Sequence, residues 1–148
     1  MAYYFAYGSN LSGSEMDKWC CDYKLVSVVK LVDYKLDFTR FSKNRQCGVA
    51  DIVKSSNTVV WGVVYDIGED EFISLDKKEG VASGAYKRIE VDVINVNEKT
   101  LTAQTYCVMN KQNFIKPSKE YLSIIIESSK KQNFPKYYIN SLEKTETL

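Results

Sequence analysis

The sequence predicts an α+β fold, a mixed sheet or a small barrel, in one domain that spans residues 1–148. Residues 23–67 read as one strand after another, with no helical segment between them. Helical periodicity is confined to a few short segments, and long strand runs of this kind argue against a doubly wound sheet. A chain of 148 residues is also long enough to bury one full hydrophobic core.

The first half of the chain is mostly strand. Residues 3–7 predict a short apolar strand that ends at Gly8, and residues 12–19 predict a short helix. Further strands are expected at residues 23–32, 34–41, 47–53 and 58–67, separated by Asp33, a polar loop and a turn at 55–57. Gly62 lies inside the most apolar of these segments, so we expect a bulge there or the close approach of another segment.

The second half alternates helices with a hairpin. Residues 68–79 predict a helix that Gly80 ends, and residues 86–96 and 101–109 predict two strands joined by a turn. A long helix is expected over residues 119–131, followed by a last helical segment through Tyr138 and Leu142. The total is about six or seven strands and three or four helices.

Composition excludes several classes of function. The net charge of +1 offers no broad basic field for a nucleic acid, and no apolar segment is long enough to span a bilayer. The start of the chain has no signal-peptide pattern, so we expect a cytoplasmic protein with reduced thiols.

The four cysteines lack metal-ligand spacing, and we interpret them as small, mostly buried hydrophobes. Because the chain has no histidine, acid–base chemistry would fall to a carboxylate, Lys, Tyr or Cys.

The sequence Tyr7-Gly8-Ser9-Asn10 is a candidate anion-binding turn. Gly8 can take backbone angles closed to other residues, and the oxygens of Ser9 and Asn10 suit the cap of a following helix. A strand, a glycine turn and a helix start leave several amide N–H groups aimed at one spot, which can bind carboxylates and oxyanions. An ordinary capped turn explains the same residues, so this stretch alone leaves both interpretations open.

Glu79 is the carboxylate that does not fit its helix. A negative charge in the last turn is disfavoured by the helix dipole. At 100° per residue, Glu79 lies within about 60° of Phe72 and Leu75 on the apolar face, whereas Lys77 and Lys78 project elsewhere. Burial and the dipole would both raise its pKa, which suits a general base that later acts as an acid. The alternative is a glutamate that emerges into solvent or pairs with an Arg or Lys.

Six segments together resemble a known family. They are residues 5–11, 34–38, 60–65, 75–81, 83–86 and 117–121, and they follow one another from Phe5 to about Leu142. With Glu79-Gly80 and Trp61-Gly62 at these separations, the chain resembles the γ-glutamylcyclotransferase family with its AIG2-like fold. The resemblance implies a small mixed β-barrel of about six strands with flanking helices. It also implies no metal and no cofactor, and a homodimer, which is common in this subgroup.

The resemblance further implies the parts of a site. Glu79 matches the acid–base glutamate of the family, and backbone groups of Gly8, Ser9 and Asn10 would hold the glutamyl part of a substrate. The substrate-binding residues that it implies are Tyr4, Phe5, Ala6, Tyr7, Gly8, Ser9, Asn10, Tyr86 and Tyr121. Tyr121 equally fits a core tyrosine, and Tyr86 fits an ordinary strand residue.

The implied reaction is intramolecular aminolysis of a γ-glutamyl dipeptide, which yields 5-oxoproline and a free amino acid. One carboxylate suffices to take a proton from the attacking amine and return it to the leaving nitrogen, in keeping with a chain that has no histidine. The alternatives are a γ-glutamylamine cyclotransferase, a remover of γ-glutamyl protecting groups, an enzyme acting on glutathione, and a non-catalytic relative that binds a carboxylate ligand. The expected partner is a small γ-glutamyl molecule, with no nucleic acid and no membrane.

Overall fold

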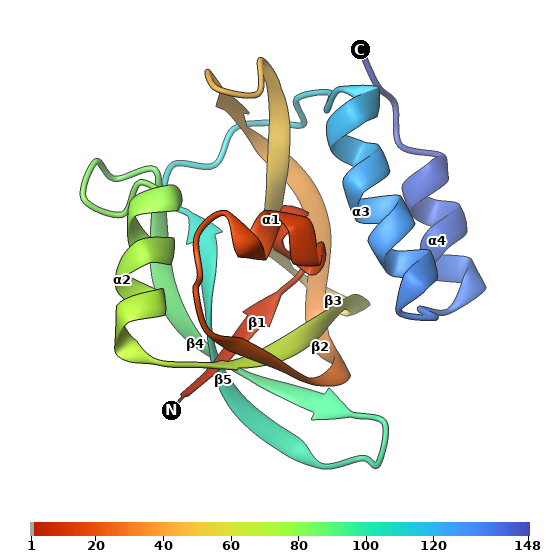
Figure 1. Cartoon of the computed structure of the whole chain (residues 1–148). Helices are drawn as coiled ribbons and strands as arrows, with labels where there is room; N and C mark the ends of the chain where they lie inside the picture. The colour runs from red at the N-terminus through yellow and green to blue at the C-terminus, as the bar shows by residue number, and fades with distance from the viewer. Residues whose placement is uncertain (1) are drawn as a thin grey trace.

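The computed structural model describes residues 2–148, which form a closed five-stranded barrel surrounded by helices (Figure 1). The strands are β1 (Ala2–Ala6), β2 (Tyr23–Ser42), β3 (Cys47–Ile67), β4 (Tyr86–Asn95) and β5 (Thr100–Val108). They follow the order β1-β3-β2-β4-β5 around the barrel. The pairing of β1 with β5 is parallel and the other pairings are antiparallel, so the predicted mixed α+β barrel is confirmed.

Two strands are longer than predicted, which lowers the strand number from about six or seven to five. β2 continues through Asp33 and β3 through Asn57, although both residues have positive φ angles of 67° and 64°. The amide of Asn57 donates to Asp33 Oδ1 at 3.1 Å, and the β2–β3 register shifts at this point. Asp and Asn tolerate such angles better than most residues, so they bend this hairpin without ending its strands.

The helices lie around the barrel. They are the short 3₁₀ helix η1 (Ser9–Leu11), α1 (Gly13–Asp17), α2 (Glu69–Lys78), α3 (Lys119–Lys131) and α4 (Lys136–Glu143). In Figure 1, α2 lies on one side of the barrel, whereas α3 and α4 pack together on the other side. The predicted bounds of the helix at 119–131 are confirmed. None of the helices in residues 2–148 has both the length and the apolar run that crossing a membrane would require.

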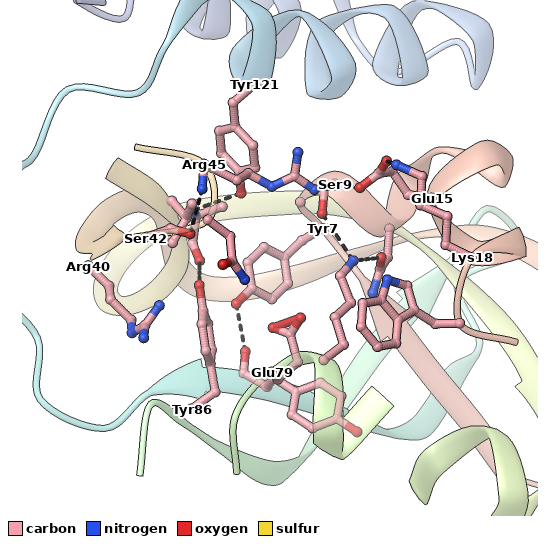
Figure 2. Close-up of a pocket in the computed structure, with 18 of the residues that line it drawn as sticks. Tyr7, Ser9, Glu15, Lys18, Arg40, Ser42, Arg45, Glu79, Tyr86 and Tyr121 are labelled. Atoms are coloured by element: carbon pink, nitrogen blue, oxygen red, sulfur yellow. Dashed lines mark hydrogen bonds and ion pairs between the residues drawn. The ribbon is translucent and has the colours of Figure 1, made fainter. Parts of the chain in front are cut away.

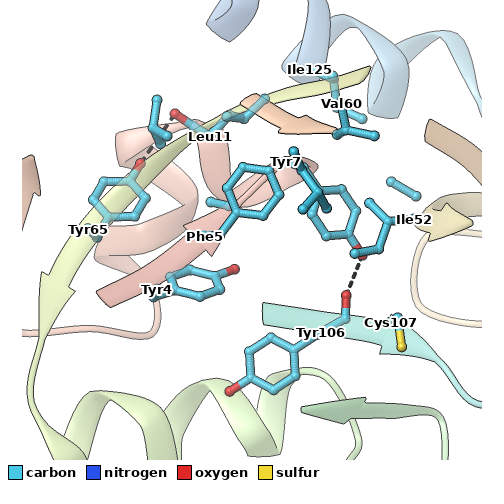
Figure 3. Close-up of a cluster of buried hydrophobic side chains, with 14 of the residues drawn as sticks. Tyr4, Phe5, Tyr7, Leu11, Ile52, Val60, Tyr65, Tyr106, Cys107 and Ile125 are labelled. Atoms are coloured by element: carbon cyan, nitrogen blue, oxygen red, sulfur yellow. Dashed lines mark hydrogen bonds between the residues drawn. The ribbon is translucent and has the colours of Figure 1, made fainter. Parts of the chain in front are cut away.

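The core fills the barrel, where Phe5, Ile52 and Val60 are among the buried side chains in Figure 3. A Cβ atom on Gly62 would lie 2.3 Å from the carbonyl oxygen of Ala6 and 2.5 Å from Cε1 of Phe5. The predicted close approach at Gly62 is therefore confirmed, and it lets β1 press against β3. All four cysteines are free thiols, and all except the exposed Cys21 are buried, in line with their interpretation as small hydrophobes.

Candidate active site

A cavity of about 460 Å³ opens beyond the end of β1, and Figure 2 shows residues that line it. The predicted site residues in its lining are Tyr4, Tyr7, Gly8, Ser9, Asn10, Glu79, Tyr86 and Tyr121. Phe5 and Ala6 are absent from this lining, which corrects their predicted contact with a substrate. Both are fully buried in the core, where Phe5 packs at Gly62 and its carbonyl accepts a 2.7 Å hydrogen bond from Thr105.

The turn after β1 lines the cavity, and its amide N–H groups make no hydrogen bond within the described chain. Within residues 2–148, no described hydrogen bond has the amide N–H of Gly8, Ser9 or Asn10 as its donor. These are the first donors of a helical turn, which lack internal partners by geometry. A Cβ atom on Gly8 would lie 3.2 Å from Ala50 Cβ and 3.7 Å from the Tyr121 hydroxyl oxygen. Glycine therefore keeps space open beside these amides.

Ser9 and Asn10 do not cap a helix, contrary to the prediction. The N-cap of α1 is Ser12, and it makes no side-chain cap hydrogen bond. The side-chain oxygens of Ser9 and Asn10 instead accept hydrogen bonds from the Lys78 ammonium group. Asn10 also donates to the Tyr4 hydroxyl at 2.9 Å. These contacts hold the turn against the end of α2.

Lys78 therefore points to the cavity, and Lys77 also lines it, which corrects the prediction that both lysines project elsewhere. Helix geometry alone could not reveal this position, because the long side chain is drawn back by oxygens from a distant turn. Burial lowers the pKa of Lys78, while the nearby carboxylates of Glu79 and Glu15 act in the opposite direction. The result is a partly buried cation beside the unused amides.

Glu79 directly follows α2 and ends it, and Gly80 then turns the chain with a φ of 64°. The amide of Glu79 donates to the Leu75 carbonyl at 2.9 Å, so the helical geometry behind the prediction is maintained. Its carboxylate faces the cavity (Figure 2), and within the described chain it has no salt bridge or side-chain hydrogen bond. Burial raises the pKa of Glu79, and the charges of Lys78, Arg40 and Arg45 offset only part of this rise.

Tyr86 and Tyr121 meet at the backbone of Ala50. The Ala50 amide donates to the Tyr121 hydroxyl at 3.0 Å, and the Tyr86 hydroxyl donates to the Ala50 carbonyl at 2.8 Å. The two tyrosines thus satisfy peptide groups of β3 that would otherwise face the cavity unpaired. The hydroxyl proton of Tyr86 is engaged in this hydrogen bond. The hydroxyl oxygen of Tyr121 is an acceptor here, so its own proton remains available for another partner. Both residues are core-like in burial, yet both line the cavity.

The prediction missed a group of charged residues at the cavity, namely Glu15, Lys18, Arg40 and Arg45. Arg45 pairs with Glu15, and its guanidinium carbon lies 5.0 Å from the ring centre of Tyr121. Lys18 pairs with the same carboxylate at 2.6 Å. Burial raises the pKa of Glu15, but the hydrogen bonds from Lys18 and Arg45 outweigh it and leave the pKa lowered. Arg45 lies within the predicted polar loop at residues 42–46, which was the available signal for it, whereas no local pattern marked Arg40.

The cavity thus combines three chemical elements. Free amide donors and the ammonium of Lys78 can hold an anion, and a desolvated carboxylate can exchange a proton. Further cations lie on its rim. Within residues 2–148, no group of three or more His, Cys, Asp or Glu side chains is arranged to hold a metal ion.

Comparison with known proteins agrees with this arrangement. Residues 59–142 match the model of the AIG2-like family. The chain is 37% identical over 147 residues to the γ-glutamylcyclotransferase of Bos taurus, an alignment that covers 95% of this chain and 78% of the bovine protein. It is 35% identical to the human enzyme of the same name, with 97% and 78% covered.

Among solved structures, one described as a γ-glutamyl cyclotransferase superposes with a TM-score of 0.93 at 34% identity. The superposition covers 99% of this chain and 89% of the other. Sequence and structure therefore agree over nearly the full length of the chain. On these comparisons, the chain belongs to the γ-glutamylcyclotransferase family with its AIG2-like fold.

Proposed function

We propose that this protein is a γ-glutamylcyclotransferase that converts γ-glutamyl amino acids into 5-oxoproline and a free amino acid. The observation that carries the proposal is the Glu79 carboxylate, which faces the cavity without a partner in the described chain and has a raised pKa. A site that only bound anions would gain nothing from such a group, whereas proton transfer requires one. The names of the bovine and human relatives support the same activity.

The glutamyl end of the substrate binds at the turn after β1. Its α-carboxylate accepts hydrogen bonds from the free amides of Gly8, Ser9 and Asn10, next to the Lys78 ammonium. Tyr121 contributes its remaining hydroxyl proton, since its oxygen lies 3.7 Å from the position of a Cβ on Gly8. This binding mode places the α-amine and the γ-carbonyl of one molecule in the same cavity.

The reaction then needs one carboxylate. Glu79 takes a proton from the α-ammonium group, and the amine nitrogen attacks the γ-carbonyl carbon to form the C–N bond of a five-membered ring. Glu79 returns this proton to the leaving nitrogen, and the original amide C–N bond breaks. Glu79 then takes the second proton from the ring nitrogen, which becomes the lactam N–H, and passes it to the released amine, so that the amino acid leaves as an ammonium. Because both reacting groups belong to one substrate, the protein mainly holds the reactive shape and moves the proton.

The activity is tested by incubating the protein with γ-glutamyl-alanine and measuring 5-oxoproline, alanine and glutamate in a single turnover. We expect 5-oxoproline and alanine in equal amounts, without glutamate. Release of glutamate would indicate hydrolysis and contradict the proposal. Binding of the dipeptide with no product would support the non-catalytic carboxylate-binding relative instead.

A further inference from the structure

Arg40 directly follows a β-bulge in β2. The β2–β3 register shifts between Phe38 and Arg40, so Thr39 is the extra residue of a bulge. Thr39 turns into the core and donates to Asp51 Oδ2 at 2.7 Å. Arg40, the next residue, lines the cavity of the active site and also a second hollow beside Ser83–Ala85, Asn110 and Gln112.

The guanidinium group of Arg40 is available for a ligand. Its carbon lies 5.9 Å from the ring centre of Tyr86, which steadies it beside the cavity. No Asp or Glu in residues 2–148 lies within salt-bridge distance of Arg40, although Arg45 and Arg88 each have such a partner. A half-buried arginine without a carboxylate, next to a polar cavity, is suited to bind one from outside.

Two of the cations that line the cavity, Lys78 and Arg40, have different neighbours. Lys78 is bound to Ser9 and Asn10, and Arg40 lies against Tyr86. In the view of Figure 2, Glu79 stands between Ser9 and Arg40. A ligand that reacts at Glu79 with one carboxylate at Ser9 would extend its other half towards Arg40.

We propose that Arg40 determines substrate specificity by binding the carboxylate of the leaving amino acid. This inference rests on the proposed function. In a γ-glutamyl amino acid, the leaving half carries a second carboxylate that can accept a bidentate hydrogen bond from the guanidinium group. A γ-glutamyl derivative of a simple amine has no carboxylate next to the leaving nitrogen and would leave Arg40 unpaired. The site therefore favours γ-glutamyl amino acids over γ-glutamylamines.

The test compares γ-glutamyl-alanine with γ-glutamyl-alaninamide, which has nearly the same shape but a neutral end. For the unmodified protein, we expect kcat/KM to be about 10- to 100-fold higher for the acid, as for a hydrogen bond between charged groups. At a pH well above the Glu79 transition, where the effect of the Arg40 charge on the pKa of Glu79 no longer matters, Arg40→Gln should lose about this factor on the acid, mainly through KM, and change little on the amide. Arg40→Lys should recover part of the preference, because it keeps the charge but not the bidentate geometry.

Lys87→Gln is the matched control, since Lys87 is exposed on β4, lies outside the cavity lining and carries the same charge. It should leave the preference for the acid unchanged. Equal use of the two substrates by the unmodified protein would overturn the inference without any variant. An equal loss on both substrates in Arg40→Gln would also overturn it. If the unmodified protein formed 5-oxoproline from neither substrate, the proposed function itself would fail.

Discussion

Two carboxylates of the protein, Asp51 in β3 and Glu79 at the end of α2, differ in the hydrogen bonds that they accept. Asp51 is fully buried within β3 and is surrounded by hydrogen-bond donors. It accepts bonds from the Thr39 hydroxyl (2.7 Å), the Lys111 ammonium (2.7 Å), the Ile52 amide (2.8 Å) and the Val108 amide (2.9 Å). Glu79 accepts none from the described residues, and burial raises its pKa.

This difference distinguishes a carboxylate that stabilises the fold from one that can exchange a proton with a substrate. The hydrogen bonds of Asp51 connect β2, β3 and β5. Both of its carboxylate oxygens are therefore engaged in stabilising the barrel. Glu79 ends a helix at the cavity, where its charge is unpaired and partly accessible. Burial of a carboxylate alone does not indicate catalysis; the lack of donors around it does.

The largest effect should follow from Glu79→Gln, which keeps the shape of the side chain but cannot take up a proton. We expect kcat/KM for γ-glutamyl-alanine to fall by about 10²- to 10⁴-fold, the usual contribution of general acid–base catalysis. The melting temperature should stay the same or rise, because the variant no longer buries a charge. Steady-state 5-oxoproline release and a thermal melt measure the two effects.

Glu69→Gln provides the control for this variant, because Glu69 is an exposed glutamate at the start of the same helix. It should keep full activity. Glu79→Gln activity within a few-fold of the unmodified protein would remove Glu79 as the base.

A smaller effect, of the opposite kind, is expected for Asp51→Asn. An asparagine cannot accept all four bonds, and it leaves the Lys111 ammonium without its carboxylate. We expect the free energy of unfolding to fall by about 2–4 kcal/mol, since removing the buried partner of an ion pair and leaving buried donors unsatisfied are both costly. That loss corresponds to a melting temperature lower by about 4–16 °C for a chain of this size. The folded variant should still release 5-oxoproline.

Asp92→Asn is the matched substitution on the surface, where Asp92 accepts one 2.9 Å bond from Thr102. It should change stability by less than about 0.5 kcal/mol. If Asp51→Asn were as stable as Asp92→Asn, the structural role of Asp51 would be wrong.

The sequence predicted Glu79 but not Asp51 for a physical reason. Glu79 stands out locally, because a short helix and a following glycine suffice to place it on the apolar face. Asp51 is satisfied by donors from two other segments, Thr39 of β2 and residues 108–111 at the end of β5, which no local pattern contains. Tyr86 and Tyr121 were predicted from the resemblance, but no local pattern shows that their hydroxyls meet at Ala50, because the residues are 35 positions apart in the chain.

The class of fold and the bounds of α3 were predictable, because strand runs and the Pro-Ser start of that helix are local features, whereas the cap of α1 was predicted wrongly. The strand number was wrong because Asp33 and Asn57 resemble strand ends yet only bend the β2–β3 hairpin. Arg40 was missed because the bulge at Thr39 has no sequence signature, and the same bulge brings Arg40 to the cavity. Tertiary contacts, rather than propensities, decide these positions.

The most direct test of the central claim is the pH dependence of kcat/KM for γ-glutamyl-alanine, which reports groups of the free enzyme and substrate. A base with a raised pKa is protonated at low pH, so activity should fall as the pH drops through a midpoint above the ordinary glutamate value of 4.5. The residual activity of Glu79→Gln should lack this transition. A rate that stays constant down to pH 4.5, or the same transition in Glu79→Gln, would contradict the assignment of Glu79 as the proton-transferring group.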